Sequence, residues 1–493
     1  MKEDFKERKG WVIERLGDIV VSEKGKKPKS VSKESNKEFQ IPYVNIKAFE
    51  KNEIDEYTDG IGCVLCNEGD FLMVWDGSRS GYVGKAVAGA LGSTLVKIDF
   101  PGISNDYTYY FLQSKFLQIN TRAKGVGIPH VDPTLLWNYQ IPLPPLSEQH
   151  AIVSKIEQLF SELDKGIEVL KAAQQQLKVY RQSVLKWAFE GKLTEKWRQN
   201  QDLPDAQELL EKIQKERKEK VKASGKKLKP VAPLTMEELN ALPAVPKGWE
   251  WVRLAFLAEI KGGITVDSKM SKENCRPVPY LRVANVQRGY LDLTEIKTIY
   301  ASDSEVEELR LIKDDILFNE GGDRDKLGRG WVWNNEIKEC IHQNHVFRAR
   351  VNRNHIISKF ISYYSNAFGQ NYFVSHGKQT TNLASINLTK LSAFPIPLCS
   401  LSEQHQIVQE VESRLSECDN MGTTIAASLQ QAEALRHSIL KKAFEGRLLN
   451  EKELEAVRQD PAWEPAERLL ERIRSDKAGL QPNKPGRKGK HKV

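Results

Sequence analysis

Two long segments of the chain carry apolar residues at a regular spacing of seven. In the first segment these residues form one strict row and one less strict row. The rows are Ile156, Leu163, Leu170, Leu177 and Val184, and then Ile152, Leu159, Ile167 and Tyr180. The second segment places Val411, Cys418, Ile425, Ala432 and Ile439 at the strict positions. A heptad spacing sustained over this length predicts helices packed as a coiled coil.

The predicted helices begin after proline-rich turns. Prolines precede Ser147, which we interpret as a helix N-cap, and no proline follows until Pro204. We expect helices over residues 148–190 and 403–445, antiparallel to one another. At a rise of 1.5 Å per residue, each helix would be roughly 60 Å long. Helices of this length would act as a rigid spacer between the domains that they carry.

The two segments are copies of each other. Residues 146–193 align with residues 401–448 at a constant offset of 255, and 23 of the 48 positions are identical. The sequences ahead of the two copies have few identical residues but carry the same order of strand signals. Each has a Pro-Tyr strand signal and, later, an acidic-apolar strand, at Pro42 and Gly69 in one and at Pro279 and Asp314 in the other. The duplication therefore predicts two related halves.

The predicted fold class is α+β. We expect two globular α/β domains separated by two long antiparallel coiled-coil helices in a pseudo-twofold arrangement. The predicted parts are a first domain (1–145), a helical spacer (146–200), a basic linker (201–247), a second domain (248–400), a second helical spacer (401–450) and a basic C-terminal tail (451–493).

Charge modifies this picture only locally. Lys and Arg number 74 against 66 Asp and Glu, so the formal net charge is +8. This excess lies mainly in residues 211–230 and in the final stretch PGRKGKHKV. We interpret both runs as solvated linker and tail, which is compatible with weak contact to phosphates.

The cysteines and the hydropathy indicate the compartment. Six cysteines without a pattern favour a reducing environment. Cys63 and Cys66 have the spacing of a zinc or redox pair, but no second pair lies nearby, which favours thiols buried in a strand. No apolar run is long enough to cross a membrane, and residues 1–10 contain no apolar signal segment. We expect a cytoplasmic protein.

Glycine-rich loops in both domains carry the candidate binding residues. Glycine allows close approach of the backbone, and Arg, Lys, Asn and Gln match the hydrogen-bonding edges of bases. In the first domain the candidates are Lys26, Lys27, Ser78, Arg79, Ser80, Tyr82, Lys85, Lys124 and His130. In the second they are Arg282, Asn285, Arg324, Lys326, Arg329, Gln343, Asn344, His345, Lys378, Gln379, Thr380 and Asn382. Each loop taken alone is typical of a plain surface turn. Lys26 and Lys27 fit phosphate contact better than base contact.

No catalytic constellation is recognisable in the sequence. It contains no phosphate-binding loop GxxxxGK[ST] and no motif for methylating a base amino group. The triplets that begin at Glu295 and Glu336 have the residues of a nuclease site, but alternating strands explain them better. The nine histidines form no metal-ligand cluster. We therefore expect no catalytic residues, no metal and no directly bound cofactor.

The repeated stretches PLPPLSEQHAIV and LKWAFEGKL, with LSEQHQIV and LKKAFEGRL in the second copy, resemble the specificity subunit of type I restriction–modification systems. The resemblance covers nearly the whole chain. It implies two target-recognition domains that each read one half of a two-part site in double-stranded DNA. It also implies assembly with two methylation subunits that use S-adenosylmethionine to modify adenine, and with restriction subunits that use ATP and Mg²⁺.

The repeat also suggests where such partners would bind. The identical residues at the two helix ends, Phe189 with Glu190 and Phe444 with Glu445, are candidate contacts for two copies of one partner. Two other functions remain open. A stand-alone DNA-binding regulator would need no partner, and a divergent nuclease would cleave DNA by itself.

Overall fold

The computed structural model describes residues 10–125, 127–224, 230–265, 274–322, 326–376, 378–379 and 384–480. The chain divides into two compact units. Unit 1 comprises Met1–Lys171 and Ala426–Val493, and unit 2 comprises Ala172–Ile425. Each unit therefore contains one globular domain, part of both long helices, and the segment that follows one of those helices.

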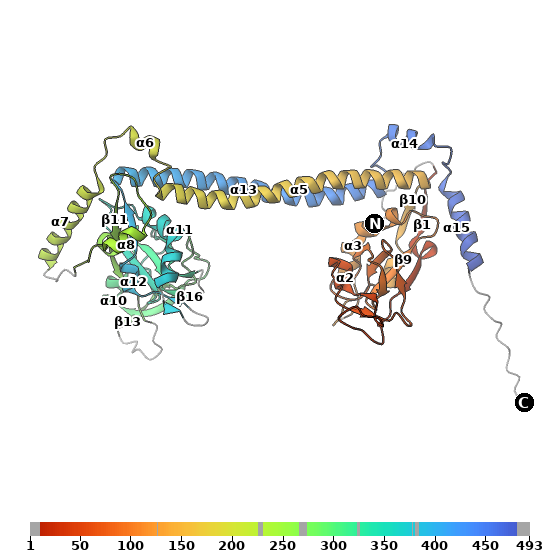
Figure 1. Ribbon diagram of the computed structural model, residues 1–493, viewed down its shortest axis with the longest axis horizontal. Coiled ribbons are helices and arrows are strands. Elements are labelled where there is room, and N and C mark those ends of the chain that lie inside the picture. The colour runs from red at the N-terminus through yellow and green to blue at the C-terminus, as the bar shows by residue number, and fades with distance from the viewer. Residues whose placement is uncertain are drawn as a thin grey trace, which may run out of the picture. The chain divides into compact units, whose positions relative to one another are not determined.

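The long helices are α5 (Leu146–Phe189) and α13 (Leu401–Phe444), each of 44 residues. Their bounds confirm the predicted helices to within two residues at each end. In unit 2 the Arg181 guanidinium lies 2.5 Å from Asp419. In unit 1 the equivalent residue, Arg436, is paired with Asp164. In each unit, an arginine near the end of one long helix pairs with an aspartate in the first half of the other helix. The two helices are therefore antiparallel, as predicted (Figure 1).

The predicted heptad rows lie on the buried sides of the two helices. Ile156, Val184, Val411, Cys418 and Ala432 are all at most 5% exposed. The remaining members of the strict rows are half-buried. The apolar periodicity of the sequence thus marks the side of each helix that packs.

Both long helices end at a glycine. Gly191 and Gly446 have φ values of +70° and +65°, in the left-handed region that favours glycine. After α5, the Lys192 N–H donates to the Trp187 carbonyl at 2.8 Å. The Arg447 N–H makes the same bond to Lys442 at 2.7 Å. The repeated Phe-Glu-Gly stretch is therefore a helix stop.

The first domain contains three small sheets. Its strands are β1 (Val12–Arg15), β2 (Val21–Lys24), β3 (Ile41–Val44), β4 (Tyr57–Thr58), β5 (Leu65–Cys66), β6 (Phe71–Val74), β7 (Val83–Lys85), β8 (Gly89–Leu91), β9 (Leu95–Asp99) and β10 (Gln140–Leu143). Its helices are α1 (Leu16–Ile19), α2 (Ile46–Lys51), α3 (Asn105–Thr121) and α4 (Pro133–Trp137). The sheets have the orders β1-β10, β2-β9-β6-β7 and β4-β3-β8-β5, and the pair β3-β8 is parallel.

The second domain repeats this plan with differences. Its strands are β11 (Glu250–Arg253), β12 (Ala258–Lys261), β13 (Cys275–Leu281), β14 (Lys297–Ser302), β15 (Ile316–Asn319), β16 (Gly321–Gly322), β17 (Gly330–Val332), β18 (Ile341–His342), β19 (Val346–Val351), β20 (Lys378–Gln379), β21 (Ala384–Ser385) and β22 (Pro395–Leu398). Its helices are α9 (Leu254–Leu257), α10 (Asp303–Leu309), α11 (Ser358–His376) and α12 (Leu388–Ser392).

One sheet has the same strand order in both domains. The order β12-β19-β15-β17 in the second domain matches β2-β9-β6-β7 in the first, and both sheets are antiparallel. The other sheets of the second domain are β11-β22, β14-β13-β18 and β16-β21-β20. The acidic-apolar stretches predicted as equivalent strands are β6 and β15, and they occupy equivalent places.

The basic run at residues 211–230 is not simply solvated over its helical part, residues 211–224, which corrects that prediction, whereas the final stretch PGRKGKHKV lies outside the described residues. After α5 come α6 (Glu195–Gln199), α7 (Ala206–Ser224) and α8 (Met236–Ala241), and after α13 come α14 (Glu451–Arg458) and α15 (Ala466–Leu480). Leu209 and Ile213 of α7 are 8% and 4% exposed, and Leu469 and Ile473 of α15 are 3% and 4% exposed. The charged residues thus lie beside an apolar stripe that packs on a domain.

The six cysteines are free thiols. Cys66 lies in β5 with 3% exposure, and burial raises the pKa of its thiol. Within the described ranges, no group of three or more His, Cys, Asp and Glu side chains could hold a metal ion. In the same ranges, no helix has the length and apolar character needed to span a membrane.

Candidate nucleic-acid interface

Four loops of the first domain meet at one end of the β2-β9-β6-β7 sheet. They are residues 24–27 at the end of β2, 75–82 between β6 and β7, 92–94 before β9, and 122–125 with 127–132 after α3. Antiparallel pairing causes this meeting, because the ends of β2 and β6 lie beside the start of β9. The loops therefore form one surface, which we call loop cluster 1.

Asp76 ties loop cluster 1 together. Its carboxylate lies 2.8 Å from the Lys24 ammonium, and its N–H donates to the Thr94 carbonyl at 3.3 Å. Asp76 also forms an isolated antiparallel bridge with His130. All four loops are thus connected at this residue, which the sequence analysis had not selected.

Arg79 stands on the outer part of loop cluster 1. Its guanidinium lies 2.9 Å from Glu50 of α2 and 4.0 Å from the ring centroid of Tyr82. The side chain is 47% exposed even with these contacts. An arginine held in this way presents a planar set of donors at low conformational cost, which suits recognition of a base edge or a phosphate.

Lys124 and His130 face each other across a narrow turn. Each donates its backbone N–H to the carbonyl of the other, at 2.9 and 2.7 Å. The Lys124 ammonium lies 2.9 Å from Asp132, and this contact lowers the pKa of the Asp132 carboxyl. The structure thus brings two predicted residues together and adds an acidic neighbour that the sequence analysis had not chosen.

The other predictions for the first domain differ in outcome. Ser80 is fully buried, so its assignment as a DNA contact was wrong; the turn that exposes Arg79 directs this small side chain inward. Lys85 is exposed at the far end of β7, outside loop cluster 1, where it pairs with Asp106 at 2.9 Å. Ser78 is exposed in the loop between β6 and β7, and Lys26 and Lys27 are exposed in the loop after β2.

Equivalent loops meet at the same end of the equivalent sheet in the second domain. They are residues 262–265 after β12, 320–329 between β15 and β17, and 343–345 before β19. The Glu320 N–H donates to the His345 carbonyl at 2.9 Å. We call this surface loop cluster 2 and restrict it to residues that the structure describes.

A glycine permits the same close crossing in both clusters. A Cβ at Gly25 would lie 2.2 Å from the Gly92 carbonyl oxygen. A Cβ at Gly263, in the equivalent loop, would lie 1.9 Å from the His342 carbonyl oxygen. Neither site can hold a side chain, so these glycines set how closely the loops approach.

Small strands extend loop cluster 2. β16 follows Glu320 directly and pairs with β21, which in turn pairs with β20. The backbone of Lys378 and Gln379 is thereby placed in the same small sheet as Gly321 and Gly322. The side chains of Lys378 and Gln379, and the whole of Arg324, Thr380 and Asn382, lie outside the described structure, so these predictions stay untested.

His345 and Glu320 form an exposed contact in loop cluster 2. His345 Nδ1 lies 2.5 Å from Glu320 Oε2, and the His345 side chain is 55% exposed. Lys326, Arg329, Gln343 and Asn344 are half-buried. A carboxylate here can accept a hydrogen bond from a base amino group, a capacity that the sequence analysis had overlooked.

One prediction for the second domain was wrong. Asn285 is 3% exposed, and its side-chain amide donates to the carbonyls of Asp292 and Glu295. Arg282 also donates to the Glu295 carbonyl, but its side chain is 21% exposed, so its assignment as a DNA contact stays a prediction. Both residues hold the loop between β13 and β14 in place, because its carbonyls would otherwise be unsatisfied.

The predicted partner contacts at the helix ends also need correction. Phe189 is 5% exposed and packs against Phe360 and Tyr364, with ring centroids 5.2 and 5.1 Å away. Phe444 is 8% exposed and packs against Tyr107 at 5.3 Å. Both phenylalanines are therefore core residues of their domains. Glu190 and Glu445 are half-buried, and their role stays a prediction.

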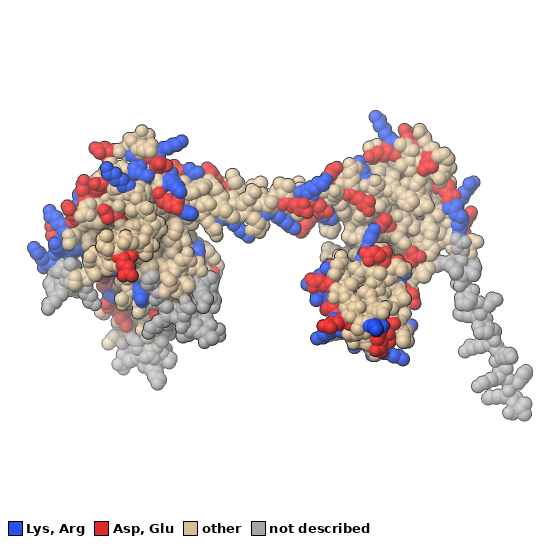
Figure 2. All heavy atoms as spheres, viewed as in Figure 1, with Lys and Arg blue, Asp and Glu red and all other residues tan. Residues whose placement is uncertain are grey.

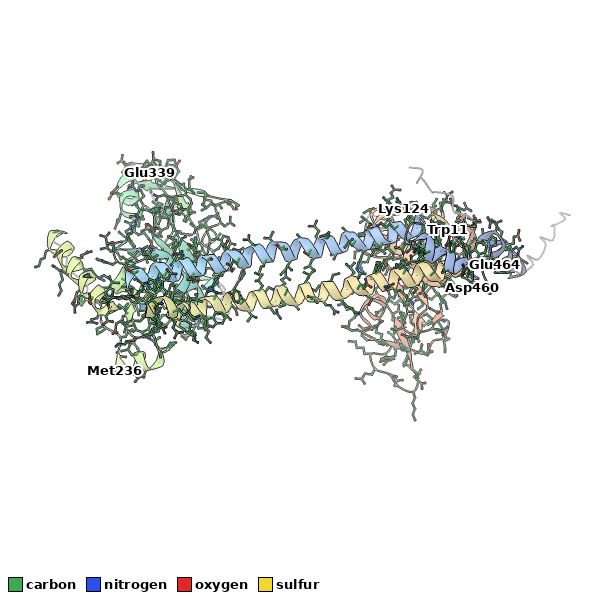
Figure 3. The ribbon with its side chains drawn as sticks, turned by 90° about the horizontal axis from the view of Figure 1, so that it is seen from above. Trp11, Lys124, Met236, Glu339, Asp460 and Glu464 are labelled. Atoms are coloured by element: carbon green, nitrogen blue, oxygen red, sulfur yellow. The ribbon has the colours of Figure 1, made fainter. Side chains whose placement is uncertain are left out.

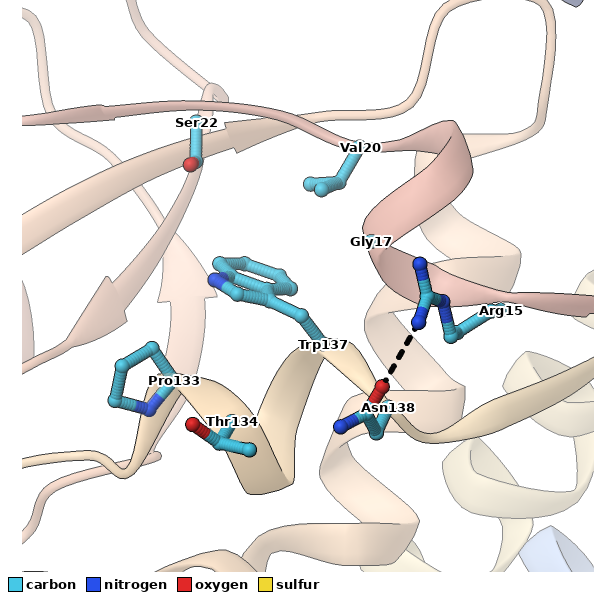
Figure 4. Close-up of a pocket in the computed structure, with 8 residues that line it drawn as sticks. All are labelled: Arg15, Gly17, Val20, Ser22, Pro133, Thr134, Trp137 and Asn138. Atoms are coloured by element: carbon cyan, nitrogen blue, oxygen red, sulfur yellow. Dashed lines mark hydrogen bonds between the residues drawn. The ribbon is translucent and has the colours of Figure 1, made fainter.

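A hollow of about 510 Å³ lies beside β2 and α4 of the first domain. Figure 4 shows its lining, which comprises Arg15, Gly17, Val20, Ser22, Pro133, Thr134, Trp137 and Asn138. The Arg15 guanidinium donates to Asn138 Oδ1 at 3.2 Å. Trp137 packs against Trp75, the first residue of the loop between β6 and β7, and the two ring centroids are 6.2 Å apart. The hollow thus borders loop cluster 1, and nothing in the sequence analysis had indicated it.

Charge on the first domain is mixed. Figure 2 shows Lys and Arg side chains interspersed with Asp and Glu on the visible face of this domain. Lys24, Arg79 and Lys124 each have an acidic partner within 3 Å. Such pairs position the cations, and phosphate oxygens can compete for them when a polyanion approaches.

Comparisons with known proteins agree with a DNA-recognition role. The family model of the type I restriction modification DNA specificity domain matches residues 8–172 and 246–431. The specificity subunit of the type I restriction enzyme MjaVIII of Methanocaldococcus jannaschii is 35% identical over 184 residues, which cover 35% of this chain and 43% of that one. The specificity subunit of EcoKI of Escherichia coli is 25% identical over 400 residues, which cover 80% of this chain and 75% of that one.

Two solved structures share the fold. A structure of a type I R-M system, described for its complex assembly and conformational transition, superposes with a TM-score of 0.62 at 18% identity, covering 90% of this chain and 100% of that one. The HsdS subunit of Thermoanaerobacter tengcongensis gives a TM-score of 0.50 at 18% identity, covering 91% of this chain and 100% of that one.

Proposed function

The chain belongs to the family of type I restriction modification DNA specificity domains, and we propose from this that loop clusters 1 and 2 each read one half of a two-part site in double-stranded DNA. The chain is a specificity subunit and is not itself an enzyme. The sequence that it selects directs adenine methylation and restriction, which its partner subunits carry out.

The repetition of loops between the two domains is the observation that carries this proposal. In both domains the loop between β6 and β7 or between β15 and β17 carries polar candidates, and it meets the loops before β9 or β19 and after β2 or β12. Strand order, end of sheet and glycine crossing are the same, while the side chains differ. Two surfaces with one frame and different hydrogen-bonding groups suit the reading of two different sequences.

The long helices carry exposed apolar residues that a partner could contact. In unit 2, Met421 is 56% exposed and Trp187 is 37% exposed. In unit 1, Leu435 is 46% exposed. Scattered exposed apolar side chains are normal on protein surfaces, so the family match, and not this exposure, supports partner assembly. We propose that each unit binds one methylation subunit, which gives two in all, and that restriction subunits join that complex.

The cofactors of the reaction belong to the partners in this proposal. S-adenosylmethionine would serve the methylation subunits, and ATP and Mg²⁺ would serve the restriction subunits. The proposed compartment is the cytoplasm, where these partners and the DNA meet.

The decisive experiment maps methylated adenines. The chain is expressed with its methylation subunits in a host without other adenine methylation, and the modified positions are read genome-wide. We expect one motif with two specified parts and an unspecified gap. Exchange of Lys326 and Arg329 for alanine should alter one part and leave the other unchanged. Modification at one uninterrupted motif would contradict the proposal, as would equal changes in both parts.

A further inference from the structure

Each long helix begins with the sequence Leu-Ser-Glu-Gln, and its glutamate is buried. Glu148 of α5 and Glu403 of α13 are 0% and 2% exposed. A buried carboxylate destabilises a protein unless it is paired and hydrogen-bonded. The partners of these two residues therefore matter for how the surrounding segments are held.

Glu148 receives its hydrogen bonds from two distant segments of unit 1. The Trp11 indole, just before β1, donates at 2.7 Å. The Trp463 indole and the Arg458 guanidinium, from the segment that follows α13, donate at 3.1 and 3.2 Å. Figure 3 shows Trp11 near the start of α5, with Asp460 and Glu464 of that segment close by.

Glu403 has an equivalent set of donors in unit 2. The Trp249 indole, just before β11, donates at 2.9 Å. Arg198 and Thr194, from the segment that follows α5, donate at 2.5 and 2.8 Å. The chemistry is repeated, with an indole from the start of the domain and an arginine from the segment after the other long helix.

The neighbouring glutamine adds a contact to the domain itself. Gln149 Oε1 accepts from the Ser104 N–H at the start of α3, at 2.9 Å. Gln404 Oε1 accepts from the Ile357 N–H just before α11, at 3.0 Å. The Glu-Gln pair at each helix start therefore joins two parts of its domain to a third segment that is distant in sequence. That segment lies more than 300 residues from the glutamate in unit 1 and about 200 residues from it in unit 2.

Backbone contacts place the same distant segments against the start of each domain. The Ala466 N–H of α15 donates to the Gly10 carbonyl at 3.0 Å, and the Ala206 N–H of α7 donates to the Gly248 carbonyl at 2.9 Å. Each domain is thus bounded at its first strand by a helix from elsewhere in the chain.

We infer that Glu148 and Glu403 are positioning residues that fix the orientation of each recognition domain. Residues 451–473 then belong functionally to the first domain. Residues 194–213 belong in the same way to the second domain. A base-reading loop needs its side chains held within about 0.5 Å of their productive positions. Loss of one glutamate should therefore disturb base discrimination in one half-site. The inference rests on the proposed reading of one half-site by each domain.

The test compares discrimination in the two half-sites. Full-length chains carrying Glu148→Gln or Glu403→Gln are assembled with their methylation subunits, and methylation rates are measured on DNA with single base changes in either half. We expect Glu148→Gln to reduce discrimination about tenfold in the half read by the first domain only, because displaced side chains penalise a mismatched base pair less. Glu403→Gln should affect only the other half. Glu168→Gln, an exposed change on α5, is the matched control.

Conservative variants distinguish positioning from a general loss of stability. Trp463→Phe keeps a ring but removes one donor to Glu148, and it should disturb the first half-site although residue 463 lies far from that domain in sequence. Glu148→Gln combined with Arg458→Met removes the unpaired cation and should recover part of the lost discrimination. Equal effects on both half-sites, or none, would overturn the inference. If the unaltered complex shows no two-part discrimination, the proposed function fails instead.

Discussion

Arg79 offers the sharpest test of how loop cluster 1 recognises DNA. Its guanidinium pairs with Glu50 at 2.9 Å, stacks over Tyr82 at 4.0 Å and keeps 47% of its surface exposed. If it reads a guanine through two hydrogen bonds, its loss should cost about 1–3 kcal/mol, or roughly 5- to 150-fold in affinity for the preferred base. The stability cost should stay near 1 kcal/mol, because both intramolecular contacts are at the surface.

Two substitutions separate base reading from phosphate contact. Arg79→Lys keeps the charge and can still pair with Glu50, but it lacks the planar, two-donor geometry. We expect it to lose discrimination at one base pair while the salt dependence of binding is unchanged. Arg79→Ala should lose the same discrimination, and any phosphate contact would add a fall of about one in the slope of log affinity against log salt.

The assay is fluorescence anisotropy of the assembled complex on labelled duplexes, at several salt concentrations, with every base substituted in each half-site. Lys85→Ala is the control, because Lys85 is exposed at the far end of β7, the strand that follows this loop, and pairs with Asp106 away from the cluster. If Arg79→Lys binds all duplexes as the unaltered chain does, while Arg79→Ala weakens binding equally on every sequence, Arg79 contacts phosphate and does not read a base.

Two further predictions concern stability. In a urea titration, Gly191→Ala should lower the unfolding free energy by about 1–2 kcal/mol because of the left-handed backbone at this position. The loss should be larger still, because the new Cβ would lie 2.3 Å from Pro246. Gly166→Ala, in open space within α5, should instead stabilise the helix by about 0.5–1 kcal/mol. Burial lowers the pKa of His342 to about 4, so the unfolded chain binds a proton that the folded domain does not between pH 6.5 and 4. Stability should therefore fall by up to about 3 kcal/mol as the pH drops through this window; an equally steep fall in His342→Gln would show that another group is responsible.

The long helices could be predicted because their signal is local and repeated. The heptad rows and the Pro-rich starts place α5 and α13 to within two residues at each end. A weaker signal was available for α7 and α15, since Leu209 and Ile213 recur as Leu469 and Ile473. High charge obscured it, because lysines on the outer side of a helix do not prevent the inner side from packing.

The candidate site was predictable only in part. The Gly-rich loops were found because glycine and polar residues cluster between strand signals, and the structure brings most of them together. The acidic partners Glu50, Asp76 and Asp132 could not be assigned, because they depend on which strands pair. Ser80 and Phe189 show the opposite error, in which a polar loop position and a repeated helix end turn out to be buried.

The bond between Trp463 and Glu148, which spans 315 residues, has a consequence for synthesis. A ribosome adds roughly 5–20 residues per second, so the first domain waits on the order of half a minute for the helix that closes against Gly10. The domain translated first is thus the one completed last. Until then the apolar surface around Trp11 stays uncovered in the nascent chain, whereas α7 has emerged before the second domain is translated.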